Sequence, residues 1–269
     1  MFCDGLTKVD EQFRCFGSRE NPKTVLLGDS HASSLYPGMV DLYERLDRGI
    51  GVLGGGSGCP PLYGVISKDG YGVDSYHCLS FISDTIDLIV KNNNIDEVML
   101  VSRGPLYTTS HGYGHVDWYD NWVLEDAHND DNKFSNERVF MAGLQRTLER
   151  LIQANKRVVY IFDVPELGFD IRTCAYGRNL PMYEKREKCT ITFSEYQKRS
   201  KPFKLKVLKL IENYPSVHII DLSEALCDKK LCYGSNGNEF YYEDDDHLSK
   251  VGAKFVVNKL KESFFRLYR

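Results

Sequence analysis

The chain has 269 residues, which is long enough to bury a sizeable hydrophobic core in one globular domain. Its formal net charge is -4 and 27% of its residues are charged, so it lacks the basic field that nucleic-acid binding requires. No apolar run reaches the roughly 18 residues of a membrane-spanning helix, and residues 1–5 show no signal-peptide pattern. We therefore expect no nucleic-acid partner, and neither a membrane span nor an export signal within this sequence.

Short runs rich in Val, Ile and Leu alternate with longer amphipathic stretches along the whole chain. The expected strands cover residues 24–27, 49–53, 97–102, 157–162 and 217–221. The expected helices cover residues 33–46, 79–92, 136–155, 193–213 and 249–265. Short apolar strands are typical of sheets buried on both faces, and alternation with helices favours parallel strands joined by right-handed crossovers. The pattern predicts a three-layer α/β/α sandwich around a doubly wound, flavodoxin-like parallel sheet of about five strands.

Three stretches do not fit this regular pattern, namely residues 54–77, 104–135 and 166–192. Each follows a strand, so all three are expected at the carboxyl edge of the sheet, where α/β proteins bind their ligands. The middle stretch is rich in aromatic residues, and we expect Tyr107 and Trp118 within it to stack on sugar rings. A loop packed by its own aromatic side chains is the alternative.

A Gly28-Asp29-Ser30 turn separates the first expected strand from the first amphipathic stretch. It places the Ser30 hydroxyl at the carboxyl end of a strand and at the start of a helix. The first N–H groups of a helix have no intrahelical partner, and together with the helix dipole they stabilise a developing oxyanion. Ser30 is therefore the candidate nucleophile, and its own N–H is a candidate oxyanion donor.

A base for this serine is expected near the other end of the chain, where the sequence reads Asp244-Asp245-Asp246-His247. A neutral imidazole can take the serine proton, and a carboxylate on its other nitrogen orients the ring and stabilises the imidazolium that forms. The spacing favours Asp244 over its two neighbours as this carboxylate. A calcium loop or a solvated acidic patch is the alternative, and we expect neither a metal nor a cofactor.

Two other histidines are rival bases with weaker signals. His31 directly follows the serine, so at a helix start its side chain points away from Ser30. We expect it to bind substrate or to support the site from behind. His218 lies within an apolar strand, which is typical of a structural position.

The eight cysteines form four couples that are close in the sequence. These are Cys3 with Cys15, Cys59 with Cys78, Cys174 with Cys189, and Cys227 with Cys232. Buried free thiols are the alternative, whereas zinc is not expected because no Cys-x-x-Cys pair occurs. Disulfide bonds imply an oxidising compartment, which conflicts with the missing export signal unless the chain is part of a longer exported or membrane protein.

These motifs resemble the SGNH/GDSL hydrolase superfamily, whose first block carries a Gly-Asp-Ser nucleophile and whose last block reads Asp-x-x-His. Gly-Asp-Ser-His at 28–31, Gly-Cys-Pro-Pro at 58–61 and Asp-Asp-His-Leu-Ser at 245–249 are more similar still to the SGNH domain fused to bacterial membrane acyltransferases of the acyltransferase-three family. The resemblance covers nearly the whole chain. It implies a single domain over residues 1–269 with a disulfide-linked extension at about 1–22, tethered in a longer membrane protein and exposed to the periplasm.

The oxyanion hole departs from the superfamily pattern. Superfamily members use the serine N–H, a glycine N–H and the asparagine of a Gly-x-Asn-Asp block, and no such block occurs here. Arg103 follows the third expected strand, where that asparagine is expected, so it is a candidate oxyanion donor with a structural salt bridge as the alternative. Gly56 and Gly58, which follow the second expected strand, are the candidate glycine donors.

The resemblance implies an O-acyltransferase that carries an acetyl group on Ser30. The implied acceptor is a hydroxyl of a cell-surface polysaccharide such as lipopolysaccharide O-antigen. A membrane acyltransferase domain, fused N-terminally, is the implied source of acetyl groups. A carbohydrate or lipid esterase with the same triad is the second hypothesis, and a glycan-binding module that lost its chemistry is the third.

Overall fold

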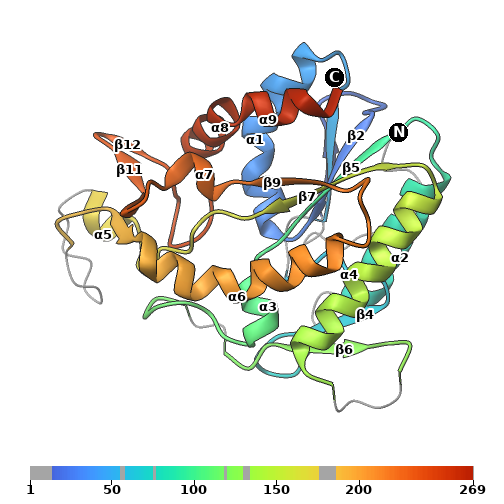
Figure 1. The fold of residues 1–269 in the computed structure, drawn as a ribbon, viewed down its shortest axis with the longest axis horizontal. Coiled ribbons are helices and arrows are strands. Elements are labelled where there is room, and N and C mark those ends of the chain that lie inside the picture. The colour runs from blue at the N-terminus through green and yellow to red at the C-terminus, as the bar shows by residue number, and fades with distance from the viewer. Residues whose placement is uncertain are drawn as a thin grey trace.

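The computed structural model describes residues 14–54, 58–74, 77–117, 120–129, 134–175 and 186–268. A six-stranded sheet with the order β1-β3-β2-β5-β7-β9 lies at its centre (Figure 1). The strands are β1 (Arg14–Gly17), β2 (Thr24–Gly28), β3 (Ile50–Gly54), β5 (Glu97–Val101), β7 (Arg157–Phe162) and β9 (His218–Asp221). All five predicted strands are present and parallel to one another.

The edge strand β1 was not predicted from the sequence. It runs antiparallel to β3 and has only four residues, Arg-Cys-Phe-Gly, which carry no apolar pattern of their own. Its backbone pairs with β3, a long-range interaction that no local pattern reveals.

Helices cover both faces of the sheet, which separates two hydrophobic cores. One face carries α1 (Ser30–Arg45), α7 (Ser223–Leu226), α8 (Lys250–Lys259), α9 (Lys261–Phe265) and the 3-10 turn η1 (Arg266–Tyr268). The other carries α2 (Cys78–Lys91), α3 (Gly104–Thr109), α4 (Asn136–Gln153) and most of α6 (Phe193–Ile211). Leu26 of β2 enters the first core, and its neighbours Val25 and Leu27 enter the second. The predicted α/β/α sandwich is therefore confirmed.

Two of the expected helices differ from the observed ones by more than two residues. The first helix begins at Ser30 instead of residue 33, because the Asp29 side chain caps it by accepting the N–H of His31. The last expected helix is divided at Leu260 into α8 and α9. No described helix has the length and hydropathy needed to cross a lipid bilayer.

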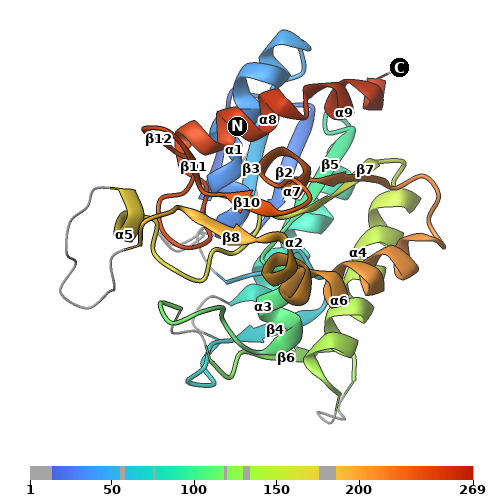
Figure 2. The same ribbon diagram turned by 60° about the vertical axis from the view of Figure 1, so that its left-hand side comes forward.

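Short strand pairs and disulfide bonds order the parts of the chain that lack a regular pattern. β4 (Val65–Lys68) pairs with β6 (Val123–Asp126), β8 (Thr190–Thr192) with β10 (Leu231–Tyr233), and β11 (Ser235–Asn236) with β12 (Glu239–Phe240) (Figure 2). The short helix α5 (Arg172–Ala175) precedes β8. Disulfide bonds join Cys59 to Cys78, Cys174 to Cys189 and Cys227 to Cys232, the couples that sequence proximity favours.

Three residues singled out in the sequence lie outside the described part of the chain. They are Cys3, Gly56 and Trp118. Cys15, the expected partner of Cys3, is disulfide-bonded.

Glycines allow the ends of β2, β3 and β5 to lie close together directly before the Ser30 turn. Gly28 is in register with Gly54 on one side and with Val101 on the other. A Cβ atom on Gly28 would lie 1.8 Å from the carbonyl oxygen of Val101. Gly54 has a φ of +102°, and its Cβ would lie 2.1 Å from the Gly28 oxygen. Neither position accepts a side chain unless the strand ends move.

The substitution Gly28→Ala is expected to lower the free energy of unfolding by about 3 kcal/mol or more, because a buried backbone oxygen must move to admit the methyl group. Gly72→Ala is the control for backbone strain alone, because Gly72 has a φ of +74° and nothing lies within 4 Å of its Cβ position. It should cost only the backbone strain, about 1 to 2 kcal/mol. Urea unfolding measures both, and equal losses would contradict the steric explanation.

Candidate active site

The structure brings together the serine and the histidine that the two sequence motifs single out. Ser30 is the first residue of α1, at the carboxyl end of β2, and it is half-buried. Its Oγ lies 2.7 Å from Nε2 of His247, although the two residues are 217 positions apart in the chain. This is the contact that proton transfer from the serine to the imidazole requires.

The other ring nitrogen of His247 faces two carboxylates. Nδ1 lies 2.8 Å from Oδ2 of Asp244 and 2.8 Å from Oδ1 of Asp246. Asp244 also accepts the backbone N–H groups of Asp246 and His247, at 3.0 and 2.7 Å. His247 is thus within hydrogen-bond distance of both Ser30 and Asp244, the serine and the aspartate singled out from the sequence. Asp246 joins them as a residue that spacing alone did not indicate.

These carboxylates change the basicity of His247. Burial lowers the pKa of its imidazole, but the hydrogen bonds and charges of Asp244 and Asp246 outweigh this effect and raise the pKa to about 11. The imidazolium is therefore strongly stabilised in this site.

Asp29 fixes the turn that carries Ser30. Its side chain is buried, and its Oδ1 accepts the N–H of His31 at 3.0 Å. Its Oδ2 accepts the N–H of Arg103 at 3.0 Å and the hydroxyl of Tyr107 at 2.8 Å. The Gly-Asp-Ser turn is thereby tied to the segment that follows β5.

Tyr107 is not available for stacking on a substrate. It is only 1% exposed and packs against Trp122 and Phe140, with its hydroxyl on Asp29. The expectation that it binds sugar rings is therefore wrong, and the alternative of a segment packed by its own aromatic side chains describes it. A phenol buried beside a carboxylate supports the nucleophile turn instead.

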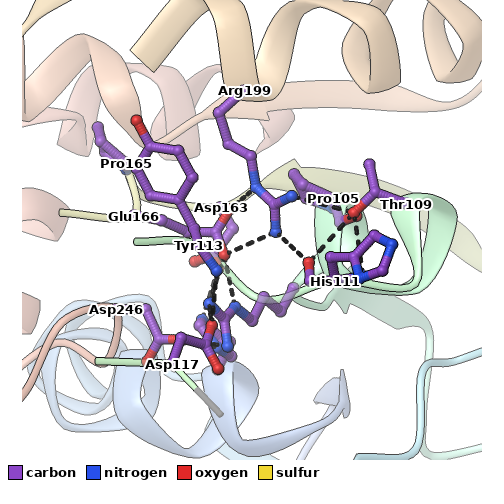
Figure 3. Close-up of polar contacts among 12 residues, drawn as sticks. Pro105, Thr109, His111, Tyr113, Asp117, Asp163, Pro165, Glu166, Arg199 and Asp246 are labelled. Carbon is purple, nitrogen blue, oxygen red and sulfur yellow. Dashed lines mark hydrogen bonds and ion pairs between the residues drawn. The ribbon is translucent and has the colours of Figure 1, made fainter. Parts of the chain in front are cut away.

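Arg103 is engaged by carboxylates and is not directed to an oxyanion. Its guanidinium is buried and forms ion pairs with Asp117, with Glu166 at 2.5 Å and with Asp246 at 2.7 Å. Glu166 is shared with Arg199 of α6, at 2.5 Å, and Figure 3 shows Arg199 on one side of Glu166 with Asp117 and Asp246 on the other. The oxyanion role suggested for Arg103 is thus corrected to the structural salt bridge.

His31 is buried and packs against the ring of His247. It is 2% exposed, and its Nδ1 forms an ion pair with Oδ2 of Asp163 at 2.5 Å. Its ring lies against that of His247, with centroids 4.6 Å apart and an angle of 32° between the planes. Burial lowers the pKa of His31, but the charge of Asp163 outweighs this and raises it to about 9. Its burial excludes the direct substrate contact that was the other expectation.

Of the candidate N–H donors to an oxyanion, those of Ser30 and Gly58 lie in the described part of the chain. The Ser30 N–H is the first of α1, a position that helix geometry leaves without an intrahelical partner. Gly58 packs against Trp122, since its Cβ would lie 2.3 Å from the indole ring, and its carbonyl accepts the Ser67 hydroxyl. The structure thus gives Gly58 a packing role.

The carboxylates of the site hold protein cations. Asp117, Glu166 and Asp246 lie close enough together to suggest a metal site, but the Arg103 guanidinium forms an ion pair with each of them. Asp244 faces the His247 ring. The donor set of Asp117, Glu166 and Asp246 therefore does not fit a metal ion.

The substitution Tyr107→Phe is expected to lower the free energy of unfolding by about 1 to 3 kcal/mol, because it removes a hydrogen bond from a buried carboxylate. Tyr71→Phe is the control, since Tyr71 is 93% exposed, and it should have no measurable effect. Thermal and urea unfolding give both values. An unchanged stability in Tyr107→Phe would show that this hydrogen bond does not hold the turn.

The ion pairs of Glu166 also predict how stability depends on pH. Burial alone raises the pKa of Glu166, but Arg103 and Arg199 outweigh it and lower the pKa. The unfolded chain binds this proton more readily than the folded protein, so the contribution is present above about pH 4.5 and is lost as the pH falls. In urea unfolding at pH values from 6 to 3, Glu166→Gln should have a lower free energy of unfolding than the wild type at pH 6. This free energy should also fall less steeply with decreasing pH than that of the wild type. Parallel curves for the two proteins would contradict this linkage.

The chain was compared with protein families and with known proteins. A family model described as the SGNH domain fused to AT3 domains matches residues 3–262. A search of curated protein sequences finds no match.

Two solved structures match the chain over most of its length. The periplasmic domain of a lipopolysaccharide acetyltransferase from Salmonella ser. Paratyphi A matches with a TM-score of 0.63 and 19% identity, over 92% of this chain and 85% of that chain. A GDSL-like lipase from Bacteroides thetaiotaomicron matches with a TM-score of 0.45 and 9% identity, over 92% of this chain and 89% of that chain. Because the family model spans most of the sequence, the protein belongs to the family of SGNH domains that are fused to AT3 domains.

Proposed function

We propose that the protein is an enzyme that transfers an acyl group through a covalent acyl-serine at Ser30. The observation that carries this proposal is the 2.7 Å contact between Ser30 Oγ and His247 Nε2, with Asp244 on the opposite ring nitrogen at 2.8 Å. A glycan-binding module without chemistry would not need a hydroxyl, an imidazole and a carboxylate at these distances.

The proposed reaction has two halves. In the first, neutral His247 takes the Ser30 proton as Oγ attacks the acyl carbonyl carbon of the donor. The tetrahedral oxyanion develops near the N-terminus of α1, and the imidazolium is stabilised by the carboxylates at Nδ1. His247 then gives its proton to the leaving group, and the donor bond breaks to leave the acyl ester on Ser30.

In the second half, an acceptor hydroxyl binds where the leaving group was. His247 takes the proton of this hydroxyl, its oxygen attacks the acyl-serine carbonyl, and the proton returns to Ser30 Oγ as the new ester leaves. Water in the acceptor position would give hydrolysis by the same steps. An esterase is therefore the second candidate, and it differs from the transferase only in the acceptor.

The family supports a more specific proposal for donor and acceptor. We assign the donor group as acetyl and the acceptor as a hydroxyl of a cell-surface polysaccharide such as lipopolysaccharide O-antigen. The support is the fusion of such domains to AT3 domains and the fold shared with the periplasmic domain of a lipopolysaccharide acetyltransferase. A fused membrane acyltransferase domain would supply the acetyl group, and residues 1–269 would form one periplasmic domain beside the inner membrane.

The substitution Ser30→Ala should lower the release of nitrophenol from p-nitrophenyl acetate by at least about 1,000-fold, because the covalent step is lost. Ser80→Ala is the matched control, because Ser80 is exposed on α2, and it should keep the wild-type rate. Intact mass should show one acetyl group on the wild type and on Ser80→Ala, and none on Ser30→Ala.

Equal rates in wild type and Ser30→Ala would overturn the proposed nucleophile. If the acetyl adduct forms, adding a polysaccharide with free hydroxyl groups separates the two candidates. A transferase would form acetyl esters on the polysaccharide at the expense of free acetate, whereas an esterase would release acetate at an unchanged rate.

A further inference from the structure

We propose that Asp246 is a second carboxylate partner of His247, which shares the Nδ1 proton with Asp244 and is held in place by Arg103. Asp246 would then be a positioning residue for the reaction, because it acts through the imidazole and does not touch the reacting atoms. Its effect on catalysis rests on the proposed function, whereas its contact with the ring does not.

The two oxygens of Asp246 face different cations. Oδ1 lies 2.8 Å from Nδ1 of His247, the same distance as Oδ2 of Asp244, and Oδ2 lies 2.7 Å from Nη1 of Arg103. A single N–H at Nδ1 can therefore be shared between two acceptors. Because Arg103 binds the second oxygen of Asp246, the first is kept on the imidazole.

The two carboxylates differ in their exposure to solvent. The side chain of Asp244 is 40% exposed, whereas that of Asp246 is 4% exposed. Water screens the charge of Asp244, but it screens a buried charge much less. At equal distances from Nδ1, the buried carboxylate therefore acts on the ring through a lower dielectric.

The charges around Asp246 leave an excess of negative charge beside His247. Three carboxylates share two guanidinium groups in this cluster, and its members are Arg103, Asp117, Glu166, Arg199 and Asp246. The groups facing the His247 ring are Ser30 and His31 from α1, and Asp244 and Asp246 from its own loop. His31 is paired with Asp163, which follows β7, and its Nε2 lies 3.8 Å from Oδ2 of Asp246. One negative charge therefore remains in the cluster to stabilise the imidazolium.

The substitution Asp246→Asn should lower the pKa of the His247 ring by about 1 to 3 pH units, because it removes an adjacent opposite charge. The ring pKa is measured by NMR titration of the imidazole nitrogen signals. The acid limb of kcat/KM for p-nitrophenyl acetate should move to lower pH by a similar amount, because a base with a lower pKa becomes neutral at lower pH. The limiting kcat should fall at least about 10-fold as the imidazolium loses a partner.

Asp41→Asn is the control, because Asp41 is 58% exposed on α1 and its ion pair is with Lys254. It should leave both the ring pKa and the pH profile unchanged. Circular dichroism and the thermal midpoint establish whether each variant is folded. A ring pKa in folded Asp246→Asn equal to that of the wild type would overturn the proposal.

The substitution Asp244→Asn tests whether Asp246 shares the Nδ1 proton of His247, and it leaves all members of the buried cluster around Arg103 unchanged. If Asp246 shares the proton, the His247 pKa in this variant should stay well above the ordinary value of about 6.5. A fall to that value would show that Asp244 is the sole partner and would overturn the proposal. If the wild type shows no turnover that depends on Ser30, the proposed function fails, and the ring titrations still decide the role of Asp246.

Discussion

The buried guanidinium of Arg103 is the interaction on which the arrangement of the site depends. Its side-chain donors meet Asp117, Glu166 and Asp246, which come from three loops far apart in the chain, and its N–H donates to Asp29. Buried carboxylates are costly unless a cation compensates them, so without the guanidinium these loops would repel one another. Arg103 therefore ties the Ser30 turn to the loop of His247, through its backbone N–H on one side and its guanidinium on the other. The sequence suggested an oxyanion role for Arg103, whereas in the structure its guanidinium binds the carboxylates that hold the site together.

Local patterns were sufficient to predict the sheet and most helices, because each depends on residues near in sequence. Strands buried on both faces are nearly continuous apolar runs, and β2, β3 and β5 are buried at every position. The start of α1 was three residues late in the prediction, because a cap depends on where the Asp29 side chain turns. The strand β1 has no such local signal and exists only through its pairing with β3.

The site was predictable to the extent that its chemistry lies in short motifs. Ser30, Asp244 and His247 were singled out from two motifs, and the structure brings them together. Arg103 was a candidate oxyanion donor and Tyr107 a candidate for stacking on sugar rings, because their true partners are distant in the chain. Glu166 is 63 positions from Arg103, and Asp29 is 78 positions from Tyr107. A sequence shows that a residue can donate a hydrogen bond, but only the fold shows which acceptor it meets. Asp246 escaped prediction for a different reason, since its spacing from His247 does not suggest contact.

The proposed mechanism creates a negative and a positive charge, and the site has more groups to stabilise the positive charge than the negative one. A negative charge forms on the substrate oxygen while a positive charge forms on His247. Since Arg103 is committed to carboxylates, the oxyanion is left with backbone N–H groups such as that of Ser30, whereas the imidazolium has two carboxylates at 2.8 Å. Both charges arise in one step, so stabilising the imidazolium lowers the barrier as directly as stabilising the oxyanion. The same carboxylates raise the pKa of His247 to about 11, which makes the neutral base scarce at neutral pH. The two carboxylates therefore stabilise the transition state, but they also reduce the fraction of His247 that is neutral and able to take a proton. The reaction rate should therefore rise with pH until the imidazole is neutral.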